Sequence, residues 1–187
     1  MFSAPEKNVD QLELAPNQVV ADFGAGSGAY TMAVAKALKG TGRVYAIEVQ
    51  QGLLTTLQNT CKDQHIGNVS FIWGNIELRG GSKLGDNTCD LVILSNVLFQ
   101  APDKKAVIEE ARRVLRPSGK LLLIDWTASF NNMGPTTEQV FPEMEAKKLA
   151  EDERFSFEKS IDAGNFHYGL VFRKGLYQPP TPLARPA

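Results

Sequence analysis

Two stretches near the start of the chain combine residue types that suit an adenosine-containing ligand. The first is an apolar run, Val19–Phe23, followed by glycines at positions 24, 26 and 28. These glycines let a ligand lie against the backbone, and free N–H groups at the start of a following helix favour an anionic group. Glu48 ends the next apolar run, Arg43–Glu48, and lies about 20 residues after the glycines. At this spacing a carboxylate can accept hydrogen bonds from both ribose hydroxyls.

The glycine loop by itself fits two classes of cofactor. Residues 24–29 read G-A-G-S-G-A, which also satisfies the G-x-G-x-x-G/A pattern of dinucleotide-binding proteins. Asp22 extends the pattern to D-x-G-x-G-x-G, and a chain of 187 residues has little room for the second domain of a dehydrogenase. These observations disfavour an NAD-dependent oxidoreductase but keep it as an alternative.

Strand-like and helix-like segments alternate along the chain, which predicts an α/β fold with helices on both faces of a mainly parallel sheet. The near-continuous apolar runs fit strands that are buried on both faces. Residues 76–87 are polar and contain glycine, so we expect a loop there. We expect strands at 18–23, 43–48, 69–73, 90–95, 120–126, 155–160 and 166–173, helices at 29–38, 51–64, 104–115 and 137–152, and a turn at 117–119.

Three motifs in a fixed order resemble one family. They are Asp22 with the glycine loop, the apolar run 90–96 that ends in Ser95 and Asn96, and the segment 110–120, which leads into another apolar run. In this order and spacing, over residues 17–126, the chain resembles the class I S-adenosylmethionine-dependent methyltransferases, in particular the small-molecule, ubiquinone- and menaquinone-biosynthesis-like subgroup. The resemblance implies a Rossmann-like doubly wound sheet, strand order 3-2-1-4-5-7-6 with strand 7 antiparallel, S-adenosyl-L-methionine as the cofactor and a small-molecule methyl acceptor.

In such a sheet the ligand lies beyond the carboxyl ends of the strands, where the strand order reverses. Packing explains poorly why a carboxylate such as Glu48 ends an apolar strand, whereas ribose binding explains it. Asp22 is expected to face the methionine end of the cofactor or to brace the loop. The candidate cofactor-binding residues are Asp22, Gly24, Ala25, Gly26, Gly28, Tyr30, Glu48, Val49, Asn75, Ile76, Ser95 and Asn96.

The chain departs from the family pattern at Asn75, where relatives usually have an acidic residue that accepts a hydrogen bond from adenine. The amide of Asn75 can still accept, and it can also donate. A polar residue in an ordinary surface turn is the alternative. The departure questions the affinity for the cofactor more than the existence of the site.

Methyl transfer can be catalysed mainly by positioning the reactants, although a hydroxyl acceptor usually needs a base. The candidate catalytic residues are His167, on the last expected strand, and Asp125, near the end of the strand 120–126. A lone histidine between aromatic residues is more often structural. Residues 131–141 are either a lid over the substrate or an ordinary surface loop.

Composition limits the remaining possibilities. The net charge is −1, with 20 basic and 21 acidic residues, so we expect no nucleic-acid partner. We find no signal peptide and no apolar run of membrane-spanning length, and expect a cytoplasmic protein. Two cysteines and two histidines are too few to form a metal site, so we expect none.

We expect one methyltransferase domain over 1–175 and a proline-rich tail over 176–187. A further alternative for the function is a module that binds the cofactor without catalysis. Neither the acceptor nor the oligomeric state follows from the sequence.

Overall fold

The computed structural model describes residues 4–130 and 134–175. The tail expected at 176–187 lies outside these residues. The described strands are β1 (Val19–Phe23), β2 (Arg43–Glu48), β3 (Val69–Trp73), β4 (Cys89–Ser95), β5 (Leu115–Trp126), β6 (Phe155–Ile161) and β7 (His167–Lys174). The described helices are α1 (Pro5–Asp10), α2 (Ala29–Ala37), α3 (Gln51–Asp63), α4 (Lys104–Val114) and α5 (Glu143–Asp152).

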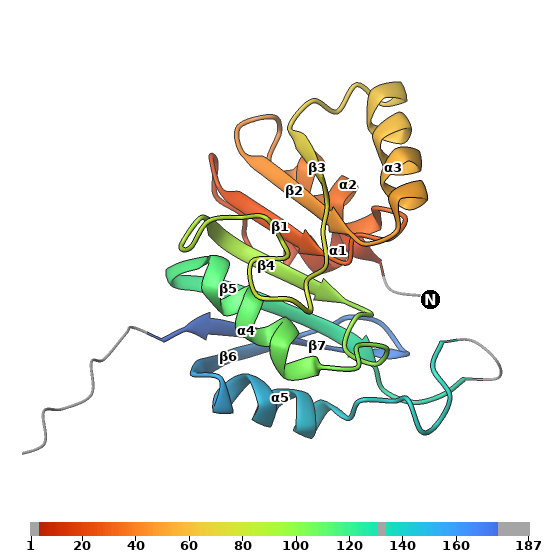
Figure 1. Ribbon diagram of the computed structural model, residues 1–187, viewed down its shortest axis with the longest axis vertical. Coiled ribbons are helices and arrows are strands. Elements are labelled where there is room, and N and C mark those ends of the chain that lie inside the picture. The colour runs from red at the N-terminus through yellow and green to blue at the C-terminus, as the bar shows by residue number, and fades with distance from the viewer. Residues whose placement is uncertain (1–3, 131–133, 176–187) are drawn as a thin grey trace, which may run out of the picture.

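The described strands form one sheet in the order β3-β2-β1-β4-β5-β7-β6. β1 to β5 pair in parallel, and β7 runs antiparallel to both β5 and β6. This topology confirms the strand order and the antiparallel strand that the sequence predicted. The order reverses between β1 and β4, which lie side by side at the centre of the sheet (Figure 1).

Alternate residues of the central strands enter two different cores. Ala21 and Phe23 of β1 join the core beneath α4 and α5, whereas Val20 joins the core beneath α1 and α2. A smaller cluster beneath α3 includes Leu57 and Cys61. Because helices cover both faces of the sheet (Figure 1), its central strands have few polar positions, which explains their continuous apolar runs.

Two helices differ from the sequence prediction. The helix expected over 137–152 begins only at Glu143, because Pro142 disfavours helical backbone in the residue before it and itself occupies the cap position. α1 was not predicted. Its signals are short: Pro5 at the first helical position and Val9 buried against α2.

β5 also differs from the prediction, because it begins at Leu115 instead of residue 120. The expected turn at 117–119 lies inside this strand as an irregularity. Cys89 pairs with Leu115 and Leu91 pairs with Lys120, so β5 carries extra residues at this point. Ser118 there adopts a left-handed backbone with φ 62°. The proline and glycine therefore distort the strand locally without ending it.

Gly28 connects the glycine loop to α2 and is needed for packing. It caps the helix with φ +85°, and a Cβ atom on it would lie 2.1 Å from Cδ1 of Leu57. Leu57 belongs to the core beneath α3 and is fully buried. Both the backbone conformation and the close approach of α3 therefore require glycine at this position.

We expect Gly28→Ala to lower the free energy of unfolding by about 3 kcal/mol, the sum of left-handed backbone strain and overpacking against Leu57. Gly40→Ala is the matched control, because Gly40 has φ +76° but no atom within 4 Å of the added carbon. It should lose only the backbone part, about 1 kcal/mol. Urea unfolding measures both. Equal losses would show that Leu57 moves aside without cost.

Candidate functional site

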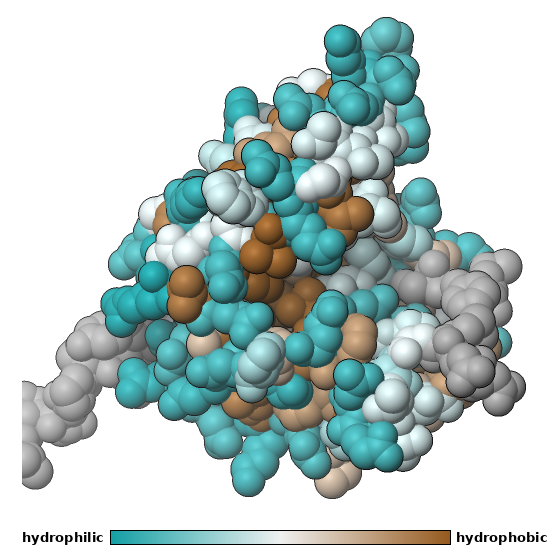
Figure 2. Space-filling view, turned by 45° about the vertical axis from the view of Figure 1, so that its right-hand side comes forward, coloured by the Kyte–Doolittle hydropathy of each residue, from teal (hydrophilic) through white to brown (hydrophobic). Residues whose placement is uncertain are grey.

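A pocket of about 600 Å³ opens at the carboxyl ends of the parallel strands, where the strand order reverses. Gly24 follows β1, Val49 follows β2, Gly74 follows β3 and Asn96 follows β4, and all four line the pocket. In the view that turns these strand ends forward, apolar residues are visible in the hollowed middle of the molecular surface (Figure 2). Ligands of open α/β sheets bind at this position.

The structure brings together nearly all the residues that the sequence singled out. Of the candidate cofactor-binding residues, only Gly28 lies outside the pocket lining. His167 lines the pocket and Asp125 does not. The predicted residues in the lining are Asp22, Gly24, Ala25, Gly26, Tyr30, Glu48, Val49, Asn75, Ile76, Ser95, Asn96 and His167. That each of them contacts a ligand stays a prediction.

Most of the other lining residues were not predicted for the site; Trp126 is the exception, since it was expected either to wall an apolar pocket or to pack in the core. Most are sequence neighbours of predicted ones, such as Gln50 after Val49 or Val97 after Asn96, so the loop positions alone could have indicated them. Pro5 is different, because it comes from α1. Nothing in the motif pattern connects this helix to the pocket.

Glu48 organises the glycine loop through its carboxylate. Oε2 accepts a hydrogen bond from the N–H of Gly26 at 3.0 Å, and Oε1 accepts one from the N–H of Gln50 at 2.9 Å. The side chain is buried and lines the pocket. A carboxylate has about four acceptor sites, so this one can hold the loop and still accept hydrogen bonds from a ligand.

Asp22 is a buried carboxyl group whose pKa is subject to opposing influences. Its Oδ2 accepts a hydrogen bond from Oγ1 of Thr31 on α2 at 2.6 Å. Burial raises the pKa of Asp22 to about 6; the bonds from Thr31 act in the opposite direction, and the charge of Glu48 adds to the increase. A cationic ligand group beside Asp22 would favour the ionised carboxylate.

Asn75 forms a structural turn and also lies in the pocket lining. Its Oδ1 accepts a hydrogen bond from the N–H of Glu77 at 2.9 Å, which is the turn expected of a structural asparagine. The residue also lines the pocket, next to the buried Ile76. Its amide group is thus fixed in place at the wall where the resemblance puts adenine.

Where β5 and β7 reach the pocket, hydrogen-bonding groups lie among aromatic residues. The ring centroids of His167 and Trp126 are 4.3 Å apart, and both residues line the pocket. Within residues 4–130 and 134–175, neither ring nitrogen of His167 nor the buried Oδ1 of Asn96 has a hydrogen-bond partner. Burial lowers the pKa of His167, so the imidazole is neutral near pH 7 and can accept a proton.

Asp125, the second candidate catalytic residue, is fully buried outside the pocket lining. Its Oδ2 accepts a hydrogen bond from the N–H of Phe99 at 3.0 Å, and its Oδ1 accepts one from the N–H of Trp126 at 2.9 Å. Burial raises the pKa of Asp125 to about 6 despite these bonds. The geometry therefore supports a structural role, in which Asp125 fastens the loop after β4 to the end of β5.

The charged residues in the pocket lining are acidic. Asp22, Glu48 and Glu77 line it, and no lysine or arginine of the described part of the chain does so. The pocket thus offers no cationic side chain to an anionic ligand.

The described part of the chain contains no group of three or more side chains that could hold a metal ion. None of its helices is long and apolar enough to cross a membrane.

Comparisons with known proteins agree with this geometry. The model of a family described as "Methyltransferase domain" matches residues 14–171. The ubiquinone/menaquinone biosynthesis C-methyltransferase of Hydrogenovibrio crunogenus is 33% identical over 113 residues, which are 60% of this chain and 43% of that protein. The arsenite methyltransferase of Aquipseudomonas alcaligenes is 32% identical over 111 residues, 57% of this chain and 32% of that protein. The chain therefore spans less than half the length of these two curated relatives.

A solved structure matches over nearly the whole chain. The S-adenosylmethionine-dependent methyltransferase from Aquifex aeolicus superposes with a TM-score of 0.83 at 25% identity. The match covers 92% of this chain and 90% of that one. The similarity thus extends well beyond residues 17–126, over which the sequence motifs lie.

Asp22 should make the free energy of unfolding depend on pH. Its pKa is about 6 in the folded protein against an ordinary value of 3.8. A pKa raised by folding stabilises the protein fully below the unfolded value, and this contribution is lost as the pH rises through the folded value. We expect the stability of the wild type to fall by about 3 kcal/mol relative to Asp22→Asn between about pH 3 and about pH 8.

Urea unfolding at the two pH values measures this difference. Asp63→Asn, at an exposed carboxylate at the end of α3, is the control and should follow the wild type. Parallel pH profiles of the wild type and Asp22→Asn would contradict the raised pKa.

Proposed function

Because this chain belongs to the methyltransferase domain family, whose model matches residues 14–171, we propose that the protein transfers a methyl group from S-adenosylmethionine to a small-molecule acceptor. The strongest support is the hydrogen bond from the N–H of Gly26 to Glu48, because it joins the glycine loop to the carboxylate at the end of β2 in the lining of one pocket. Since the chain spans less than half of the curated relatives cited above, the activity of the whole protein is part of the proposal. A single domain over 1–175 and a cytoplasmic location stay predictions from the sequence.

The residues of the pocket fit S-adenosylmethionine along its length. Asn75 and Ile76 would border adenine, Glu48 would accept from the ribose hydroxyls, and Asp22 would face the methionine end, which carries a cationic amino group. When bound, the cofactor supplies a methyl group that is already activated on sulfur. The contribution of the protein is then chiefly to hold the acceptor in line with that methyl group.

The acceptor that suits the end of the pocket at Trp126 and His167 carries no negative charge away from its reacting atom. An anionic group there would lose its hydration without gaining a cationic side chain, because the described lining has only acidic and neutral groups. The positive charge of the bound cofactor lies at its sulfur, next to the reacting atom. Trp126 offers an apolar ring, and His167 offers ring nitrogens without a protein partner. We propose that His167 accepts the proton of a hydroxyl acceptor, or orients an acceptor that needs no base.

Calorimetric titration tests the cofactor. We expect S-adenosylmethionine and S-adenosylhomocysteine to bind the wild type with micromolar affinity and NAD not to bind. Glu48→Ala should weaken binding about a hundredfold, because it removes charge-assisted hydrogen bonds to ribose. Glu48→Gln, which keeps one acceptor oxygen, should show an intermediate loss. Circular dichroism checks that both variants fold. Unchanged affinity in Glu48→Ala would reject the site, and binding of NAD alone would favour an oxidoreductase.

An acceptor panel tests the chemistry. Pairs of small hydroxyl, amine and thiol compounds that differ only by a carboxylate group are incubated with labelled S-adenosylmethionine. We expect label in the uncharged members. His167→Asn should lower turnover of a hydroxyl acceptor by about 10²- to 10⁴-fold, with S-adenosylhomocysteine binding within about twofold of the wild type. Preference for the carboxylate members would contradict the charge argument. Tight binding with no methylated product from any acceptor would favour a non-catalytic module.

A further inference from the structure

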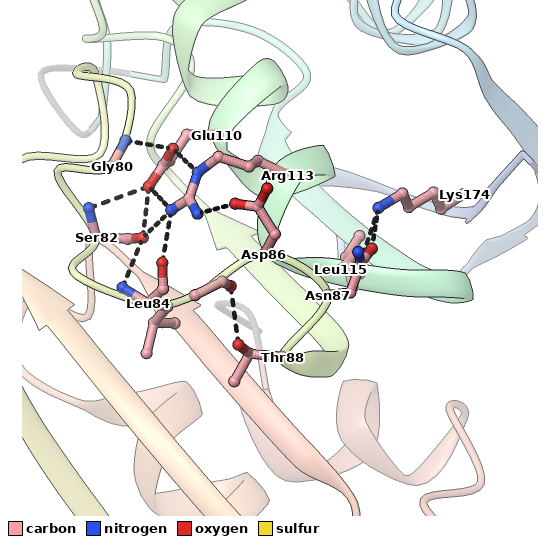
Figure 3. A network of polar contacts seen from close by, with 11 residues as sticks. Gly80, Ser82, Leu84, Asp86, Asn87, Thr88, Glu110, Arg113, Leu115 and Lys174 are labelled. Atoms are coloured by element: carbon pink, nitrogen blue, oxygen red, sulfur yellow. Dashed lines mark hydrogen bonds and ion pairs between the residues drawn. The ribbon is translucent and has the colours of Figure 1, made fainter. Parts of the chain in front are cut away.

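A buried carboxylate on α4 holds the loop that connects β3 to β4. Glu110 is 1% exposed. Its Oε2 accepts a hydrogen bond from the N–H of Gly80 at 2.8 Å, and its Oε1 accepts from both the N–H and the hydroxyl of Ser82. Figure 3 shows these bonds converging on the two carboxylate oxygens. In the sequence, Glu110 is notable only for its place in the motif 110–120.

Arg113 completes the attachment of this loop. Its guanidinium group donates to both oxygens of Glu110, at 2.8 and 2.7 Å, and to the carbonyl oxygen of Leu84 at 2.8 Å. It also pairs with Asp86 at 2.6 Å (Figure 3). Burial by itself would raise the pKa of Glu110, but the bonds from Arg113, Ser82 and Gly80 lower it to about 2. The carboxylate is therefore ionised at neutral pH.

The segment held by Glu110 packs directly on the pocket wall. A Cβ atom on Gly81 would lie 1.9 Å from the carbonyl oxygen of Asn75, and one on Gly74 would lie 2.4 Å from the carbonyl oxygen of Gly81. Two backbone hydrogen bonds link the same segments: Leu78 N–H to Asn75 O at 3.2 Å and Gly81 N–H to Leu78 O at 2.8 Å. A shift of Gly81 would therefore displace the backbone at residues 74 and 75.

Residues 74–77 line the pocket, whereas Ser82 lies outside its lining. We propose that Glu110 is a positioning residue for ligand binding: through Gly80–Ser82 it holds the backbone of residues 74–77 in the shape that receives the adenine ring. This inference rests on the proposed function, because the adenine belongs to S-adenosylmethionine. Glu110 acts on the cofactor only through the loop.

Only a carboxylate suits this position. Both oxygens of Glu110 face donors, from Gly80, Ser82 and Arg113. Glutamine of the same size would turn an NH₂ group toward N–H donors, and so lose hydrogen bonds and leave buried donors unpaired. Glu110→Gln should thus loosen the loop without creating a cavity in the core.

The neighbouring residue provides a matched control. Glu109 has the same side chain on the same helix, but it is 54% exposed and pairs with Lys105 on the surface. We expect Glu110→Gln to weaken binding of S-adenosylhomocysteine about tenfold and Glu109→Gln to leave it within about twofold of the wild type. Binding of 5′-methylthioadenosine, which contains adenine but no amino-acid end, should weaken by the same factor as S-adenosylhomocysteine.

Hydrogen exchange distinguishes positioning from general destabilisation. In Glu110→Gln, amides of residues 74–82 should exchange faster, those of β4 and β5 should keep their protection, and saturating S-adenosylhomocysteine should restore protection at 74–82. Faster exchange with unchanged affinity for both ligands would overturn the inference. So would a loss of affinity for S-adenosylhomocysteine alone, because the effect would then lie at the amino-acid end.

Two further results separate the proposals. If the wild type fails to bind S-adenosylhomocysteine, the proposed function fails and the inference fails with it. If the wild type binds and Glu110→Gln binds equally well, only the inference is overturned. Ser82→Ala removes the hydroxyl that donates to Glu110 and accepts from Leu84 N–H and Arg113. It should weaken binding about threefold, so it provides the same test if Glu110→Gln does not fold.

Discussion

The binding end of this protein depends on one topological constraint, the reversal of strand order between β1 and β4. After β1 the chain crosses to α2 on one face of the sheet, and after β4 it crosses to α4 on the other face. The loops that leave these two adjacent strands must therefore separate, and the pocket opens between them. The loops after β2 and β3 extend the pocket on one side, and the ends of β5 and β7 close it on the other.

Loops at a sheet edge have backbone N–H groups without strand partners. In three loops of this protein, buried carboxylates accept hydrogen bonds from such groups. Glu48 accepts from Gly26 and Gln50, Asp125 accepts from Phe99 and Trp126, and Glu110 accepts from Gly80 and Ser82. One of the three lines the pocket and the other two do not. The same chemical group thus serves ligand binding at one position and loop placement at two others.

Most of the fold could be predicted because its signals are local. Apolar periodicity and glycine positions located β1 to β4 and α2 to α4 to within two residues, and the resemblance to a known family implied the strand order. Two of the errors have non-local causes: burial against α2 stabilises the short α1, and pairing with β4 continues β5 past a proline and a glycine. The late start of α5 has a local cause, Pro142, which the helix prediction did not take into account.

The sequence by itself determined which residues stand at the carboxyl edge of the sheet, because strand ends and glycine loops are encoded by neighbouring residues. It therefore indicated Asp22, Glu48 and Asn96 for the pocket, and their places in the lining agree. Only the tertiary structure decided that His167 enters the pocket while Asp125 turns into the protein, and that Glu110 supports the wall from α4. These outcomes depend on contacts between residues far apart in the chain, and only packing of the whole sheet with its helices brings such residues together.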